Sequence, residues 1–119
     1  MALDHAKPGQ PVDIGPLGTA LRESATHAIL KTRSLEVIRV VLQDGQTLPS
    51  HATRGEATLL CIEGAVEVAL DGTVLQLRPN QFVLLPAQAA HTMRALEDTS
   101  LLWTIQLPAG EPGSASATT

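Results

Sequence analysis

The sequence is poor in aromatic side chains. It contains one phenylalanine, Phe82, one tryptophan, Trp103, and no tyrosine among 119 residues. A nucleic-acid strand would therefore find almost no rings on which its bases could stack. The formal net charge of −4 also repels a phosphate backbone. These two features argue against a nucleic-acid partner.

Long apolar runs and paired cysteines are also missing. No stretch of about 18 consecutive apolar residues occurs, so no segment is expected to span a membrane. The opening residues, MALDHAKPGQPVD, lack the apolar core of a secretory signal. Cys61 is the single cysteine, which excludes an intramolecular disulfide. We therefore expect a cytoplasmic protein with no membrane partner.

The length and apolar content fit one folded domain. Domains typically contain roughly 100–150 residues, and 44% of this chain is hydrophobic, which is enough to build a core. Proline and glycine are dense near both ends of the chain. We predict an extended N-terminal arm at residues 1–16, a folded domain at residues 17–107 and a flexible C-terminal tail at residues 108–119.

Short apolar segments separated by turn residues indicate an all-β fold. The segments expected to form strands are Leu35–Leu42, Thr58–Ile62, Val66–Leu70, Thr73–Leu77, Phe82–Leu85 and Leu101–Leu107. Asp71 and Gly72 between two of these segments are a strong hairpin signal, because a type I′ turn requires positive φ at both central residues. Strands at intervals of about 8–12 residues predict a sandwich or barrel.

One segment, Leu17–Leu30, is ambiguous. Its apolar residues recur at helical spacing. Its second half, Thr26–Lys31, could instead form a strand that pairs with Leu35–Leu42 through a turn at Thr32–Ser34. We favour the strand for this second half.

Two segments, in this order, resemble the two motifs of the cupin family. Residues 45–64, GQTLPSHATRGEATLLCIEG, are similar to G-x5-H-x-H-x3–4-E-x6-G and match its first histidine at His51. Residues 80–91, NQFVLLPAQAAH, resemble G-x5-P-x-G-x2-H-x3-N and match at Pro86 and His91. The resemblance covers residues 35–107. It implies a cupin double-stranded β-helix, or jelly-roll barrel, with His51 and His91 in one interior pocket, and a homodimer formed through edge strands.

The resemblance also implies a candidate metal site. Cupins commonly hold one divalent transition metal with three histidines and one glutamate. Here Thr53 stands at the position of the second histidine and Ala57 at that of the glutamate. We therefore expect either no metal or one ion held weakly by His51 and His91, since tight sites normally have at least three protein ligands. The expected pocket is completed by Met93, which shares the face of His91.

Other side chains are weaker ligand candidates. Glu56 lies one residue from the glutamate position, and an offset of one residue turns a strand side chain to the opposite face. Cys61 lies about 13 Å along the strand from Ala57, and we expect it to be a small buried side chain. His27 is not placed by the pattern and could approach the pocket from an early strand. Arg39 interrupts an apolar segment and is expected at a solvated or rim position.

Three classes of function remain open at this stage. The first, which we favour, is a binding module for an unknown small molecule or a weakly held ion. The second is a metal-dependent cupin enzyme with a reduced ligand set, such as an oxygenase, isomerase or decarboxylase. The third is a structural role in which dimer formation is the main feature. The metal-free cupin sugar epimerases pair a histidine base with a tyrosine acid, and the absence of tyrosine disfavours that chemistry.

Overall fold

The structure, a computed structural model, describes residues 5–108, and strands dominate this part of the chain. The strands are β1 (His27–Lys31), β2 (Leu35–Leu42), β3 (Thr47–His51), β4 (Ala57–Glu63), β5 (Val66–Leu70), β6 (Thr73–Leu77), β7 (Phe82–Leu85), β8 (His91–Ala95) and β9 (Thr99–Gln106), and a 3-10 helix, η1, spans Gly18–Glu23. Every strand predicted from the sequence is present. The strand favoured near residues 26–31 is confirmed as β1. The first half of the ambiguous segment forms η1, and the predicted tail from residue 109 onward lies outside the described residues.

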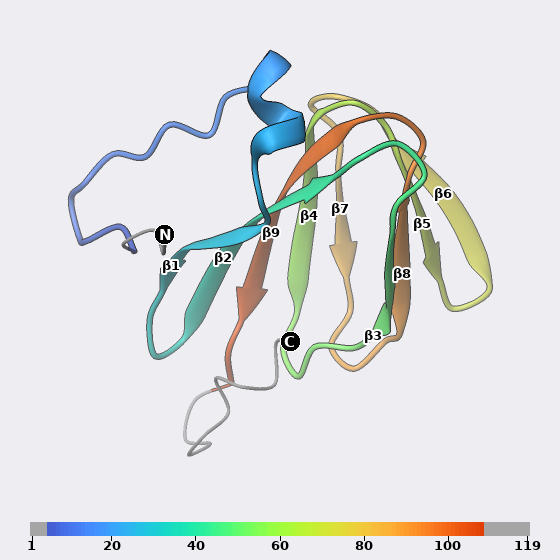
Figure 1. Ribbon diagram of the computed structural model, residues 1–119. Helices are drawn as coiled ribbons and strands as arrows, with labels where there is room; N and C mark the ends of the chain where they lie inside the picture. Colours follow the sequence, from blue (N-terminus) through green and yellow to red (C-terminus); the bar gives the residue numbers. More distant parts are fainter. Residues whose placement is uncertain (1–4, 109–119) are drawn as a thin grey trace.

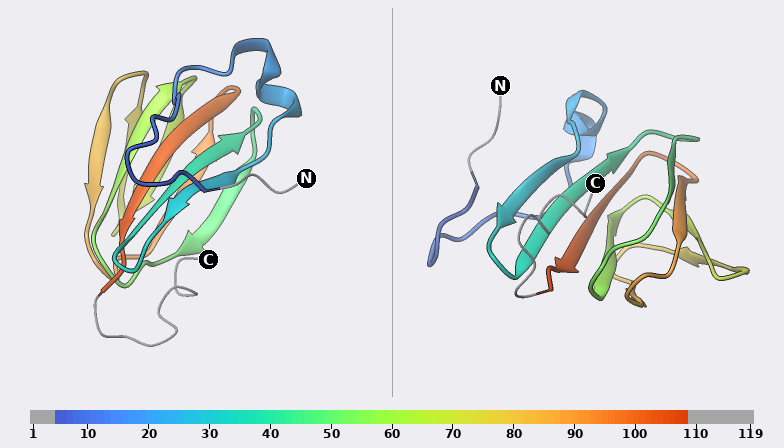
Figure 2. Two further views of the ribbon diagram at one scale, coloured as in Figure 1. Left: turned by 90° about the vertical axis from the view of Figure 1, so that its left-hand side faces the viewer. Right: turned by 90° about the horizontal axis from the view of Figure 1, so that it is seen from below.

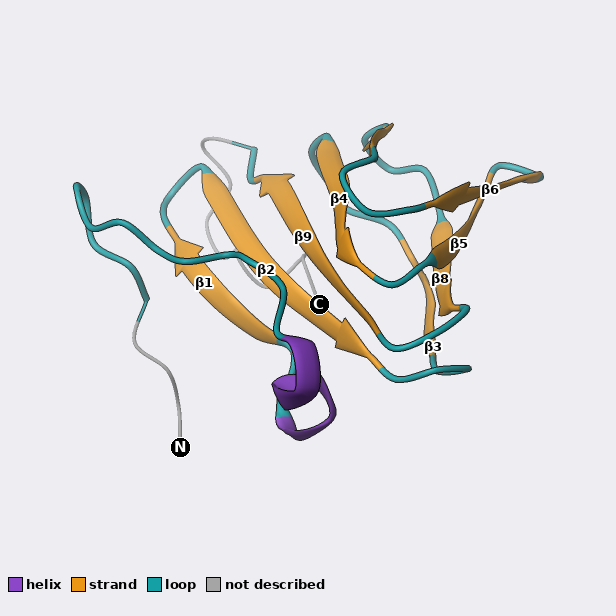
Figure 3. Ribbon diagram, turned by 90° about the horizontal axis from the view of Figure 1, so that it is seen from above, coloured by secondary structure: helices purple, strands orange, loops and turns teal. Residues whose placement is uncertain are grey.

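The strands form two antiparallel sheets that pack face to face. The five-stranded sheet has the order β1-β2-β9-β4-β7, and the four-stranded sheet has the order β3-β8-β5-β6. Figure 1 and the right panel of Figure 2 show the two sheets as separate layers. Figure 3 shows the same two layers from above. The predicted all-β barrel is confirmed. No helix within residues 5–108 is long and apolar enough to cross a membrane.

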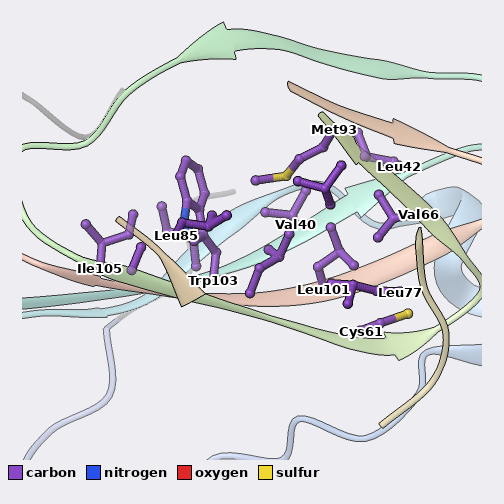
Figure 4. Packing of buried hydrophobic residues seen from close by; sticks show 14 of the residues in the cluster. Val40, Leu42, Cys61, Val66, Leu77, Leu85, Met93, Leu101, Trp103 and Ile105 are labelled. Atoms are coloured by element: carbon purple, nitrogen blue, oxygen red, sulfur yellow. The ribbon is translucent and has the colours of Figure 1, made fainter. Parts of the chain in front are cut away.

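Alternating side chains from both sheets fill the space between them. Leu59 on β4, Leu101 on β9 and Met93 on β8 are completely buried. Figure 4 shows that Met93 projects from one sheet toward Val40 on the other, and that the Trp103 ring stands in the interior beside its neighbours on the five-stranded sheet. The two-residue alternation of strand side chains therefore produces one continuous apolar core.

The N-terminal arm crosses the outer face of the five-stranded sheet, as the left panel of Figure 2 shows. Arg39 fixes the arm to this sheet: its Nη1 donates to the carbonyl oxygen of Gly15 at 3.0 Å, and its Nη2 donates to that of Asp13 at 3.4 Å. The arm covers Arg39 so well that the residue is only 4% exposed. The expected solvated or rim position for Arg39 is therefore wrong.

A β-bulge turns Glu63 out of the barrel toward the junction between the arm and η1. Cys61 and Glu63 are two residues apart on β4, whereas their partners on β9 are adjacent, so β4 carries one extra residue. The Glu63 carboxylate accepts hydrogen bonds from the Ser100 hydroxyl at 2.6 Å and from the backbone N–H groups of Leu17 and Gly18 at 2.7 and 3.1 Å. The bulge thus converts an inward-facing position into a clamp for the start of η1, at Leu17 and Gly18.

The Glu63 clamp should make stability depend on pH. Burial raises the pKa of Glu63, but the hydrogen bonds from Ser100, Leu17 and Gly18 and the charge of Arg39 outweigh burial, so the pKa lies below its usual value. A carboxyl whose pKa is lowered by folding stabilises the protein above its unfolded-state pKa, and this stabilisation is lost as the pH falls through the folded-state pKa. We expect Glu63→Gln to lower the free energy of unfolding by about 1–3 kcal/mol at neutral pH.

Urea unfolding of the wild type and of Glu63→Gln over a range of pH measures this effect. The difference between the two proteins should shrink as the pH falls below the ordinary glutamate pKa of about 4.3. A difference that stays constant from neutral pH to well below that value would show that the charge of Glu63 does not stabilise the clamp.

Candidate functional site

His91 places a polar ring inside the barrel. It is the first residue of β8 and is 1% exposed. Its ring stands edge-on to that of Trp103 on the opposite sheet, with ring centroids 5.6 Å apart and an interplanar angle of 89°. The His91 Nδ1 lies 3.4 Å from the carbonyl oxygen of Ala89. One ring contact therefore links the two sheets through a histidine.

The backbone of His51 lies beside that of His91. The two residues are register partners on β3 and β8, and the next partners along these strands are Leu48 and Met93. β3 uses three residues to cover a distance for which β8 uses two, so a β-bulge separates the two pairs. Residues three apart are out of phase in a regular strand. The extra residue in β3 brings the backbone of His51 opposite that of His91.

Two of the other predicted pocket residues lie at the same end of the barrel. We call this the His91 end: β2, β4 and β8 begin there and β3, β7 and β9 finish there, toward the lower part of Figure 1. Ala57 is the first residue of β4, and Thr53 lies in the loop before it; both are 2% exposed. The Thr53 hydroxyl donates to the carbonyl oxygen of Gly55 at 2.9 Å, and the Thr53 carbonyl accepts from the N–H of Gln88 at 2.7 Å.

Met93 lies one step deeper in the barrel than His91. It is two residues along β8 and is completely buried, so it occupies the same inner face. Its neighbours belong to the apolar core (Figure 4). The structure thus places Met93 below the His91 end, while Thr53 and Ala57 lie at that end; their role as ligand-binding residues remains a prediction.

The described side chains do not offer the ligand set of a tight metal site. Among them, no three histidine, cysteine, aspartate or glutamate side chains are grouped closely enough to hold a metal ion. Thr53 directs its hydroxyl to a backbone carbonyl, and Ala57 has no donor atom. Glu56 is exposed, as its one-residue offset predicts. The motif positions of the second histidine and of the glutamate, Thr53 and Ala57, therefore supply no metal ligand.

His27 lies on the outside of the barrel. It is the register partner of Arg39, whose side chain lies on the outer face, and its Nδ1 lies 2.9 Å from the carbonyl oxygen of Ala25. Together with Ala28 and Ile29 it lines a hollow of about 350 Å³ beneath the N-terminal arm. The sequence left open whether His27 approaches the interior pocket. The structure places it on the outer face instead.

Cys61 is a buried thiol of low reactivity. It is completely buried and belongs to the apolar core. Burial, followed by the negative charges of Glu97 and Glu63, raises its pKa to about 11. Only the thiolate is strongly nucleophilic, so Cys61 remains protonated and inert at neutral pH. The expected structural role of this residue is consistent with both findings.

One inward-facing acid was not identified from the sequence. Glu36 is 4% exposed and shares the inner face of β2 with Ile38, two residues away. Its register partner on β9 is Ile105, whose partner on β4 is Ala57, so Glu36 belongs to the row of residues at the His91 end. The sequence did contain a signal for this position, because Glu36 is in phase with the buried residues of its strand.

Comparison with known proteins connects this geometry to a family. The family described as a cupin domain matches residues 38–106. A conserved protein of unknown function from Streptococcus pyogenes superposes with a TM-score of 0.71 at 17% identity, covering 92% of this chain and 97% of that one. A cupin superfamily protein from Desulfitobacterium hafniense gives 0.70 at 16% identity, covering 82% and 94% of the two chains.

A larger protein shares the same barrel. Oxalate decarboxylase from Bacillus subtilis, which has Mn(II) centres, superposes with a TM-score of 0.59 at 17% identity, covering 63% of this chain and 22% of that one. At such identities these likenesses show the fold alone. No curated protein matches the sequence.

Proposed function

Because the chain belongs to the cupin family, we propose that the His91 end of its barrel is a binding site for a small molecule. In this proposal His51 and His91 supply the polar groups of the site. A divalent transition metal can join them but is held weakly, because two imidazoles are fewer than the three or more protein ligands of a tight site. The protein is then a binding module of the cupin type.

The observation that carries this proposal is the position of His91. Its ring is almost fully buried, yet it is the first residue of β8, and the residues of β8 that belong to the apolar core are Met93 and Ala95. Small-molecule sites typically combine apolar walls with a few polar groups that fix orientation. Trp103 and Ile105 provide apolar surface at this end, and an imidazole can donate or accept a hydrogen bond or bind a metal ion.

The position of His51 supports a shared site. Register partners in an antiparallel ladder place their side chains on the same face of a sheet. His51 and His91 are such partners. We therefore propose that both imidazoles act on one ligand, although they come from different motifs of the sequence.

Cobalt binding tests the proposal. Trp103 is the single tryptophan and contacts His91, so its fluorescence reports on this site without interference from other indoles. Paramagnetic Co(II) bound by His51 and His91 should quench the emission in a saturable way. The quenching should be lost in His91→Ala and in His51→Ala. It should persist in His27→Ala, which removes a histidine from the outer face of the barrel.

Two results would contradict the proposal. Quenching that is unchanged in His91→Ala would place the bound ion elsewhere. A near-stoichiometric transition metal in freshly purified protein, lost in both His51→Ala and His91→Ala, would show that the ion is tightly held. That second result would support the metal-dependent enzyme instead of the binding module.

We also propose that the protein forms a homodimer through β7. This strand is an edge of the five-stranded sheet, and its Phe82 and Leu84 are 69% and 53% exposed. Their partners on β4 are Leu60 and Thr58, so this part of the outer face carries no charge. An unpaired apolar edge favours pairing with another strand, and a twofold axis brings the same edge of a second copy against it.

Analytical ultracentrifugation tests the dimer. Leu84→Lys should shift the protein toward monomer, because it places a charge in the middle of the proposed contact. Val74→Lys is the matched control: Val74 is 61% exposed but lies on β6, in the other sheet. A wild type that is monomeric at all concentrations, or equal dissociation of the two variants, would refute the interface.

A further inference from the structure

We propose that Glu36 is a third polar residue of the site at the His91 end, and that this site takes a positively charged group. The group is either a divalent metal ion or the ammonium group of a small molecule. This inference rests on the proposed binding function of His51 and His91.

The Glu36 side chain is buried and incompletely satisfied. It is 6% exposed and lies in phase with the core residues Ile38 and Val40. Its Oε1 is buried and has no hydrogen-bond partner among residues 5–108. Its Oε2 lies 3.8 Å from the Nζ of Lys31, which is longer than a hydrogen bond. A carboxylate in this environment is costly for the fold, and such groups in native structures call for a functional explanation.

The sheet register places Glu36 at the same end as His91. Trp103, which contacts His91, is the register partner of Ile38. Glu36 precedes Ile38 by two residues, which puts it about 7 Å closer to the end of the barrel on the same inner face. The carboxylate therefore belongs to the row of residues immediately beyond the contact between His91 and Trp103.

Glu36 also lies in the row of the missing motif glutamate. The motif resemblance places that glutamate at Ala57, on β4. Glu36 is separated from Ala57 by one strand, β9, through their common partner Ile105. Two strand spacings correspond to about 10 Å between the backbones. Side chains on one inner face point toward the same interior, so a carboxylate from β2 acts on the space that one from β4 would have reached.

A carboxylate inside a barrel selects the charge of the ligand. Electrostatic interactions are stronger in the interior than in water, so a negative charge there attracts a cation and repels an anion. Lys31 lies at the outer edge of this row, with its side chain 29% exposed. It offsets part of the charge of Glu36 without accounting for the Oε1 atom.

The ordinary structural alternative is that Glu36 serves only to pair with Lys31 across β1 and β2. These residues are register partners, so their ion pair could help to hold the two strands together. Under that alternative, neutralising Glu36 changes stability and leaves ligand binding as it was. Measuring ligand binding by folded Glu36 variants therefore distinguishes a role in binding from a role in strand pairing alone.

The experiment measures Co(II) binding by Trp103 fluorescence in the wild type, Glu36→Gln and Glu36→Met. We expect both variants to bind Co(II) at least about tenfold more weakly than the wild type. Lys31→Met should bind it more tightly, because it removes a positive charge next to Glu36. Glu56→Gln is the matched control, since Glu56 has the same charge at the same end of the barrel but is exposed, and it should bind like the wild type.

A second arm distinguishes the source of the positive charge. Glucosamine and glucose have similar shapes but differ in one ammonium group, and thermal-shift titration compares their binding. A preference for glucosamine that disappears in Glu36→Gln would identify an ammonium ligand. A Glu36 effect confined to Co(II) would identify the metal ion as the cation.

The outcomes separate this inference from the proposed function. If His91→Ala loses Co(II) binding while folded Glu36→Gln and Glu36→Met bind Co(II) and glucosamine like the wild type, the role of Glu36 is overturned and the His91 site stands. If His91→Ala binds Co(II) as tightly as the wild type, the proposed site falls, and the role of Glu36 falls with it. Circular dichroism and thermal unfolding show whether each variant is folded.

Discussion

Gly64→Ala is expected to destabilise the protein by about 3 kcal/mol or more. Gly64 has φ +84°, a left-handed conformation that costs an alanine about 1–2 kcal/mol. A methyl group at this position would also collide with the backbone carbonyl oxygen of Asp98 and lie 2.8 Å from the Cα of Thr99. Both obstacles belong to the backbone, which cannot move aside without disturbing the start of β9. Urea unfolding measures the loss.

Gly72→Ala is the control that isolates the collision. Gly72 has φ +79°, almost the same conformation, but nothing lies within 4 Å of the position that a Cβ would occupy. Its substitution should cost only about 1–2 kcal/mol from the backbone conformation. Equal losses for Gly64→Ala and Gly72→Ala would show that the close approach of Gly64 to Asp98 does not matter.

Leu59→Ala is expected to have a similarly large effect, about 2–5 kcal/mol. Leu59 is completely buried on β4, where it is the register partner of Trp103 on one side and Val83 on the other. Its truncation removes apolar contacts and leaves a cavity at the centre of the core, next to the ring that contacts His91. Thermal and urea unfolding should both report the loss.

The adjacent residue provides the comparison. Leu60 is partly exposed on the outer face of the same strand, so Leu60→Ala should cost well under the value for Leu59→Ala. The two substitutions delete the same atoms from neighbouring positions. If they were equally destabilising, the assignment of the inner and outer faces of β4 would be wrong.

The strand pattern was predictable because its physical signals are local. Val66–Leu70 and Thr73–Leu77 alternate apolar and other side chains on either side of Asp71 and Gly72, and the structure forms this hairpin with positive φ at both turn residues. Leu35–Leu42 is likewise rich in β-branched residues and forms β2 with the same bounds. Such patterns specify strands without any knowledge of distant contacts.

β3 was not predictable in this way. Its sequence, TLPSH, contains Pro49 and lacks alternation, so it was not among the strands predicted from the sequence. The bulge between Leu48 and His51 depends on pairing with β8 and cannot be seen in the sequence of β3 alone. A bulge in β4 similarly turned Glu63 outward. Local parity therefore fails where a partner strand has a different number of residues.

The candidate site was only partly accessible to sequence reasoning. The motif positions identified His51 and His91, and the structure makes these residues register partners. Arg39 was misplaced because the path of the N-terminal arm, which buries it, is not encoded in any local pattern. Glu36 was overlooked although its phase in β2 matched the buried residues. An acid in an otherwise apolar inner face can therefore be recognised from sequence, but its surroundings cannot.

The most direct measurement of the proposed site is a long-range ¹H–¹⁵N spectrum of the histidine rings during titration with Co(II). The chain has four histidines, and His5 and His27 serve as internal references on the outside of the barrel. The ring signals of His51 and His91 should broaden together at the lowest Co(II) concentrations, before those of His5 and His27 change. Broadening of His27 or His5 first, with His91 unaffected, would contradict a shared interior site.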